Sequence, residues 1–266
     1  MHPIERLRYV ARADGAGPSL LGREAAGALA SFARDPVALV TACRRLVERH
    51  PTAGTVWWIA ARVLTEGADE AWHAAEELED DPTPGVLAAS LPDDGSVLVV
   101  GWPEQVGDAL RRRGDIEVLV ADSADRSGSA FARRLTNANV EAYDVPDAGV
   151  GAAAADVDVV LLEATALGPT GFVAAAGSRA AAAVAGHAGV PVWVCAGVGR
   201  VLPGRLWEAL VQRLDDDEAE PWERADEVVP LDLADKVCGP GGLVDAEAAP
   251  KRADCPIAPE LLKRID

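Results

Sequence analysis

The spacing of hydrophobic residues changes about a third of the way along the chain. Up to about residue 90, apolar residues recur three and four positions apart, which is the spacing of amphipathic helices. The run Pro-Thr-Pro-Gly at residues 82–85 then interrupts the helical pattern and predicts a boundary between domains. We therefore expect a helical N-terminal domain over residues 1–90. Its predicted helices cover residues 4–13, 19–35, 36–50, 55–67 and 69–81.

From residue 91 to residue 266, short runs rich in β-branched residues alternate with amphipathic stretches. This alternation is typical of a parallel sheet with helices on both faces. The pattern predicts an α/β domain with a Rossmann-like, doubly wound and mostly parallel sheet. The predicted strands cover residues 96–100, 116–122, 140–145, 157–164 and 190–197, with a weaker candidate at 226–233, and the predicted helices cover residues 103–114, 127–138, 149–155 and 178–189.

Residues 158–178 have the strand–loop–helix pattern of an active-site segment but few reactive side chains. They read as a buried strand, a turn-rich loop and a glycine, Gly177, that opens a helix. Ligands of α/β sheets bind at this end of the strands. Between Glu163 and Arg179, however, there is no charged residue, histidine or cysteine. Glu163, at the end of the predicted strand, is the carboxylate of interest.

Composition and charge narrow the class of protein. A hydrophobic content of 49% and a charged content of 26% are those of a globular protein. The net charge of −18 argues against direct binding to nucleic acid or to an anionic membrane. No apolar run reaches the ~20 residues of a membrane span, and the N-terminus lacks a signal pattern, so we expect a cytoplasmic protein.

Cysteine, histidine and glycine spacing gives no sign of a metal or a cofactor. The cysteines are widely separated and show no metal-ligand spacing with histidine, and Cys195 lies in an apolar strand that predicts a core position. Gly101 and Gly107 do not form the dinucleotide-binding pattern, and Trp102 fills the turn between them. No metal or cofactor is therefore expected. A Rossmann-like cofactor enzyme remains a minor alternative, which nucleotide co-purification would support.

Two predicted helix N-termini could bind an anion through free backbone N–H groups. One is formed by Arg126, Ser127 and Gly128, and the other by Gly177, Ser178 and Arg179. Both follow parallel strands, so both are expected at the same end of the sheet. The alternative reading is that the serines are ordinary helix caps and the arginines are solvated.

Several segments resemble the translation initiation factor 2B alpha/beta/delta family, which also contains methylthioribose-1-phosphate isomerase and ribose-1,5-bisphosphate isomerase. The resemblance covers about 210 residues from Glu24 onward and is moderately specific, because the order and spacing of the segments agree. The segments are RHPTAGTVWWIAARVL, DGSVLVVGWPEQV, VADSADRSGSAFARRL, the long block from VDVVLLEATALGPTG to VPVWVCA, and DCPIAPELL.

The resemblance implies a helical domain packed on a Rossmann-like domain, with homodimerisation or hetero-assembly through the latter. It places Trp102 where the isomerases carry a catalytic cysteine, and Thr165 where they carry a catalytic aspartate. Ala174 and Ala175 fall on the family's Asn-Lys pair, and His50 falls on the arginine of its Arg-Pro-Thr motif, with Arg49 adjacent. The positions that remain as ligand-binding candidates are Arg49, Thr52, Arg126, Ser127, Gly128, Gly171, Gly177, Ser178 and Arg179.

Two functions are therefore weighed. In the first, the chain is a non-catalytic relative that acts by self- or hetero-assembly and senses a phosphorylated sugar or nucleotide metabolite. In the second, it is a sugar-phosphate aldose–ketose isomerase with a relocated acid/base. Any remaining catalytic groups are expected at Glu163 and Thr165, although a threonine cannot itself serve as the proton-transfer group.

Overall fold

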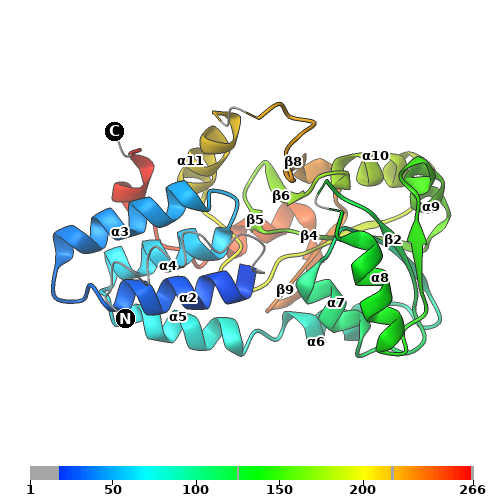
Figure 1. The fold of residues 1–266 in the computed structure, drawn as a ribbon, viewed down its shortest axis with the longest axis horizontal. Coiled ribbons are helices and arrows are strands. Elements are labelled where there is room, and N and C mark those ends of the chain that lie inside the picture. Colours follow the sequence, from blue (N-terminus) through cyan, green and yellow to red (C-terminus); the bar gives the residue numbers. More distant parts are fainter. Residues whose placement is uncertain (1–17, 125, 217–218, 265–266) are drawn as a thin grey trace.

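A computed structural model describes residues 18–124, 126–216 and 219–264. Figure 1 shows a group of side-by-side helices at one end of the molecule and the main sheet with its helices at the other. The predicted helix over residues 4–13 lies outside the described residues. The helices of the first group are α2 (Pro18–Ala30), α3 (Pro36–Arg49), α4 (Gly54–Thr65) and α5 (Glu70–Glu79).

The main sheet has seven strands in the order β10-β9-β7-β4-β1-β2-β3. All neighbouring strands are parallel except β10 and β9. The five strands predicted first are confirmed, each within two residues at either end. Their bounds are β1 (Ser96–Val100), β2 (Glu117–Ala121), β3 (Ala142–Val145), β4 (Val159–Glu163) and β7 (Val192–Cys195), followed at the edge by β9 (Lys236–Gly239) and β10 (Gly242–Asp245).

Helices cover both faces of this sheet because its central strands bury both sets of alternating side chains. In β1, Val97 and Val99 belong to one hydrophobic core, while Leu98 and Val100 belong to the core on the opposite face. This continuous burial explains the uninterrupted apolar runs in the sequence. The helices are α6 (Thr83–Ser90), α7 (Glu104–Leu110) and α8 (Gly128–Asn137) on one face, and α9 (Val150–Asp156) and α10 (Ser178–Ala188) on the other.

A second sheet corrects the expectation of a simple loop between Glu163 and Gly177. Its three antiparallel strands are in the order β5-β6-β8. The short, glycine- and alanine-rich sequence of this region carries little β-propensity of its own, and pairing with a distant strand supplies the missing stability. The bounds are β5 (Ala166–Leu167), β6 (Gly171–Ala175) and β8 (Asp226–Pro230), and the last of these confirms the weaker strand candidate.

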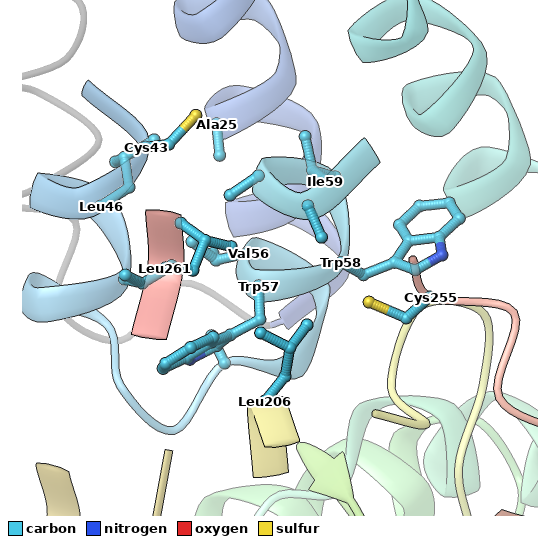
Figure 2. Packing of buried hydrophobic residues seen from close by; sticks show 14 of the residues in the cluster. Ala25, Cys43, Leu46, Val56, Trp57, Trp58, Ile59, Leu206, Cys255 and Leu261 are labelled. Atoms are coloured by element: carbon cyan, nitrogen blue, oxygen red, sulfur yellow. The ribbon is translucent and has the colours of Figure 1, made fainter. Parts of the chain in front are cut away.

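The core of the helical end includes residues from the C-terminal part of the chain. Helix α11 (Gly204–Asp215) and the 3₁₀ helix η4 (Pro259–Leu262) contribute apolar side chains to it. Figure 2 shows Leu206 of α11 beside Trp57 of α4, and Cys255 beside Trp58. The helical region is therefore completed by residues that follow the sheet in sequence. A boundary at residue 90 stays a prediction, and α6, just before it, packs on the sheet.

If the C-terminal segment closes the helical core, removing one of its buried side chains destabilises the whole fold. We expect Leu261→Ala, at a fully buried position in η4, to lower the free energy of unfolding by about 2–5 kcal/mol in urea denaturation. The matched control is Leu20→Ala on α2, where the side chain is half-exposed and a change below about 0.5 kcal/mol is expected. Equal effects of the two substitutions would contradict this assignment of the core.

Candidate functional site

The candidate site lies where the strand order of the main sheet reverses. The chain leaves β1 toward β2 and β3 on one side, and later returns to add β4 and β7 on the other. The loops that follow β1 and β4 therefore diverge, and such a switch point is the usual ligand position in doubly wound sheets. A cleft of about 990 Å³ opens there between the sheet and the turn joining α3 to α4. Its lining includes Leu21, His50, Thr52 and Ala53 from the helical end, Val100, Trp102, Pro103, Glu104, Asp108 and Arg111 around α7, Ser123, Ser127, Phe131, Arg134 and Leu135 around α8, and Glu163, Thr165, Ala175, Ser178, Ala225 and Asp226.

Glu163, at the end of β4, lies in the cleft wall with both carboxylate oxygens hydrogen-bonded. Oε2 accepts the backbone N–H groups of Gln105 (2.7 Å) and Val106 (3.1 Å) in the first turn of α7. Oε1 accepts Nη1 of Arg200 at 2.8 Å. The exposed fraction of the side chain is 0% for Arg200 and 7% for Glu163. All three partners are donors, so the carboxylate is held as a helix cap and as the counter-ion of a buried arginine.

Asp122, at the end of β2, caps the next helix in the same way. Its Oδ1 accepts the N–H of Gly128, the first residue of α8, at 2.9 Å and that of Ser123 at 3.0 Å. A Cβ atom at position 128 would lie 2.9 Å from the Cα of Asp122, so only glycine allows this approach. The N–H of Gly128 was predicted to donate to a ligand anion. In the structure it donates to the carboxylate of Asp122.

Glu227, in β8, caps the third helix. Its Oε1 accepts the N–H groups of Gly177 (2.7 Å) and Arg179 (3.0 Å) at the beginning of α10. Gly177 has a φ of 101°, a conformation that favours glycine. Both helix N-termini that the sequence offered for a phosphate are thus already occupied by a negative group from within the fold.

Helix N-termini attract anions because their first N–H groups have no partner inside the helix and carry the positive end of the helix dipole. At this end of the sheet the three carboxylates accept two of these N–H groups at α7, one at α8 and two at α10. A phosphate could take these donors only by displacing a carboxylate of similar charge. The geometry therefore weakens the prediction of a phosphate cradle.

The structure brings together only part of the predicted site. Thr52, Ser127, Glu163, Thr165 and Ser178 line the cleft. The other predicted ligand-binding residues are outside its lining, namely Arg49, Arg126, Gly128, Gly171, Gly177 and Arg179.

Gly171 has a packing role within the second sheet. It is buried in β6, and an added Cβ would lie 2.6 Å from the carbonyl oxygen of Val229 in the neighbouring strand. This close strand contact explains why glycine stands there. A role for Gly171 in ligand binding stays a prediction.

Thr165 joins the sheet to the helical end of the molecule. Its carbonyl oxygen accepts the N–H of Gly54, the first residue of α4, at 2.9 Å, and its own N–H is donated to Val173 at 2.9 Å. A Cβ at position 54 would lie 2.7 Å from that carbonyl oxygen. Thr165 is therefore held in the cleft wall by its backbone, at the contact between α4 and the second sheet.

An aromatic cluster forms another wall of the cleft. Trp102, with 41% of its surface exposed, has its ring centroid 5.6 Å from that of Phe131 on α8. The guanidinium carbon of Arg134 lies 5.4 Å from the Trp102 ring centroid. The sequence pointed to Trp102 as a bulky residue in the turn, but the contribution of Phe131 and Arg134 follows only from the packing of α8.

The charges that line the cleft are mixed, with four carboxylates and two arginines. Besides Glu163, the carboxylates belong to Glu104, Asp108 and Asp226. Arg111 forms an ion pair with Asp108. Among the residues that the structure describes, no three histidine, cysteine or acidic side chains are grouped so as to hold a metal ion.

Cys195 lies beneath this site, as a core residue. It is buried at the end of β7, and burial, with a smaller contribution from the nearby Glu163 carboxylate, raises the pKa of its thiol well above the usual range. A thiol held in the protonated form is a poor nucleophile or metal ligand. The expectation that Cys195 is a core residue is confirmed.

Comparison with known proteins agrees with this architecture. The model of the initiation factor 2 subunit family matches residues 87–229, which is more than half of the chain. The chain belongs to this family. No curated protein matches it in sequence.

Solved structures of the initiation factor 2B type share the fold over nearly the full chain. A translation initiation factor eIF-2B from Pyrococcus horikoshii has a TM-score of 0.73 at 17% identity, covering 91% of this chain and 96% of its own. The eIF2B beta subunit from Chaetomium thermophilum has a TM-score of 0.74 at 18% identity, with 99% and 93% covered. The 5-methylthioribose 1-phosphate isomerase from Pyrococcus horikoshii has a TM-score of 0.62 at 15% identity, with 91% and 84% covered.

Initiation factor subunits and an isomerase therefore share this fold, and the fold alone does not choose between their functions. The matched region contains Trp102, Thr165 and the three capped helices α7, α8 and α10. No helix in the described part of the chain has the length and apolar character needed to cross a membrane.

The ion pair between Glu163 and Arg200 gives a stability prediction. We expect Glu163→Ala to lower the free energy of unfolding by about 3–5 kcal/mol, because it leaves a fully buried guanidinium without its counter-ion. The double variant Glu163→Leu/Arg200→Met should recover most of that loss in chemical denaturation.

The matched control for this prediction is the more exposed ion pair between Asp108 and Arg111, at the edge of the same cleft. Asp108→Ala should change the free energy of unfolding by less than about 1 kcal/mol. A loss for Glu163→Ala as small as that for Asp108→Ala would show that the buried pair does not stabilise the fold.

Proposed function

We propose that this chain is a non-catalytic member of the initiation factor 2B-like family that acts by assembly with itself or with a partner chain. One observation carries the proposal: the carboxylates of Glu163, Asp122 and Glu227 take the backbone donors at the beginnings of α7, α8 and α10. Those donors would otherwise be the means of holding a phosphorylated substrate.

The side chains at the positions implied by the resemblance also support a loss of catalysis. Trp102 and Thr165 stand where the isomerases are expected to carry a cysteine and an aspartate. Aldose–ketose isomerisation moves protons between neighbouring carbons and needs groups that exchange protons near neutral pH. An indole and an aliphatic hydroxyl do not do so. Trp102 also lines the cleft.

The alternative, an isomerase that uses Glu163 as its acid/base, has weaker support. A general base must lie within hydrogen-bond reach of the proton that it removes. Glu163 does face the cleft, but both of its oxygens accept hydrogen bonds from α7 or Arg200, and little of its side chain is exposed. Releasing it for catalysis would uncap a helix and expose a buried positive charge to an apolar surrounding.

Assembly is supported by the relatives. The structure of a tetrameric eIF2B-beta2-delta2 complex from Chaetomium thermophilum matches this chain with a TM-score of 0.75 at 18% identity. By analogy, we propose that this chain forms a homodimer or a hetero-assembly through its C-terminal domain, in the cytoplasm. Its net charge of −18 favours a protein partner over direct contact with nucleic acid.

The predicted sensing of a phosphorylated metabolite is the least supported part of the proposal. Ser127 and Ser178 do line the cleft. However, the helix donors beside them are occupied by Asp122 and Glu227, and acidic side chains outnumber basic ones in the lining.

A turnover assay tests the loss of catalysis. Purified protein supplied with 5-methylthioribose 1-phosphate or ribose 1,5-bisphosphate should give no ketose product above a protein-free blank. Glu163→Gln should behave identically. Turnover by the unmodified chain that disappears in Glu163→Gln would establish the isomerase alternative and overturn the proposal.

Native mass spectrometry tests the assembly. At micromolar concentration we expect the mass of a dimer, or a monomer that forms a defined complex when mixed with a second chain of the same family. A chain that stays monomeric both alone and in such mixtures would contradict the proposed mode of action.

A further inference from the structure

Helices α9 and α10 pack side by side on one face of the main sheet, in the half of the molecule away from the helical group (Figure 1). Among the 7 residues of α9 and the 11 of α10, only Asp156 and Arg179 carry a full charge at neutral pH, whereas 26% of the whole chain is charged. Depletion of charged residues is a property of the central part of protein interfaces. The small exposed residues of these helices form the α9–α10 face, namely Gly151, Ala152, Ala155, Ala180, Ala183 and Gly186.

The glycine at position 186 has no explanation within the described chain. It lies inside α10, where glycine lowers the stability of a helix relative to alanine. Its φ is not positive, and a Cβ atom there would meet no other atom of the described chain within 4 Å. The same holds for Gly151 in the first turn of α9. A residue without a side chain allows a second helix to approach closely, so both glycines point to a helix of another chain.

The two charged residues lie at opposite ends of the α9–α10 face. Asp156 is the last residue of α9, and Arg179 is the second residue of α10. Each helix leads back to the beginning of a strand, β4 or β7, and these strands are parallel, so the two helices run in the same direction. Both residues are exposed, and neither side chain forms an ion pair or a hydrogen bond with another residue that the structure describes.

We infer that a second copy of this chain packs against the α9–α10 face, with its own α9–α10 face turned end for end about a two-fold axis. This arrangement brings Arg179 of each copy beside Asp156 of the other, so the same ion pair forms twice. It also places each arginine at the C-terminal ends of two helices, where a positive charge is favoured. The inference rests on the self-assembly proposed above and adds the surface at which it takes place.

Analytical ultracentrifugation over a range of concentrations tests the surface. The unmodified chain should sediment as a dimer that dissociates on dilution. Ala183→Arg, in the middle of α10, should raise the dissociation constant at least about tenfold, because a long charged side chain keeps the helices apart. The matched control is Asn137→Arg, exposed at the end of α8 on the opposite face of the sheet, which should leave the dissociation constant unchanged.

The outcomes separate this inference from the proposed function. A dimer that tolerates Ala183→Arg, or that responds equally to Asn137→Arg, would overturn the inference and leave self-assembly standing. A chain that stays monomeric at every concentration would overturn the inference together with self-assembly, and leave only the hetero-assembly tested by mixing with a second chain.

Gly186→Ala should have opposite effects on the monomer and on the dimer. At a concentration where the chain is monomeric, its thermal midpoint should rise, because alanine favours the helix and has room. The dimer should dissociate at least about threefold more readily, because the added methyl group lies between the packed helices. Dimerisation as tight as that of the unmodified chain would overturn the inference.

Charge reversal tests the end-for-end arrangement. Arg179→Glu and Asp156→Arg should each raise the dissociation constant at least about threefold, because each places like charges together at both ends of the interface. The double variant Arg179→Glu/Asp156→Arg restores opposite charges and should recover the dissociation constant of the unmodified chain. Single variants without effect, or a double variant weaker than both, would contradict the arrangement.

Discussion

The first N–H groups of a helix have no acceptor within the helix. At the carboxyl end of this sheet, side-chain carboxylates of the same chain accept several of them. The three helices α7, α8 and α10 all point their first N–H groups toward the same region. In a ligand-binding relative an anion can satisfy such groups. Here Glu163, Asp122 and Glu227 do so, with donor–acceptor distances between 2.7 and 3.1 Å. The loops around the cleft are therefore fixed in place without a ligand.

This internal capping is tied to the contact between the two ends of the molecule. Gln105 donates its backbone N–H to the capping carboxylate of Glu163, and its side-chain amide donates to Asp81 at 2.6 Å. Asp81 in turn accepts the N–H of Val198 at 2.9 Å, in the loop that leads to Arg200. On the other side, Thr165 receives the N–H of Gly54 from α4. These hydrogen bonds connect the wall of the cleft to the helical region, whose core includes side chains of α11 and η4. A substitution in the cleft wall is therefore expected to alter the stability of the helical region.

The sequence was sufficient to predict the strands of the main sheet. Runs such as residues 96–100 are buried on both faces and are therefore continuously apolar, which identifies them as strands without knowledge of the neighbouring strands. Glu163 and Thr165 both line the cleft, and their predicted catalytic role stays a prediction. The sequence could not predict β6, whose pairing with β8 joins residues more than fifty positions apart. The helix caps could not be predicted for the same reason, since Glu227 is 50 residues from Gly177 in the sequence. Nothing in the sequence around Arg200 indicated its buried ion pair with Glu163.

Amide hydrogen exchange measured by NMR tests the central claim most directly. If the internal carboxylates hold the helix donors, the N–H groups of Gly177, Arg179 and Gly128 exchange slowly in the ligand-free protein. Glu227→Ala should then accelerate exchange at Gly177 and Arg179 but not at Gly128, and Asp122→Ala should accelerate it at Gly128 and Ser123 but not at Gly177 or Arg179. Fast exchange at these amides in the unmodified protein, indifferent to both substitutions, would show that the helix N-termini are open and would contradict the account.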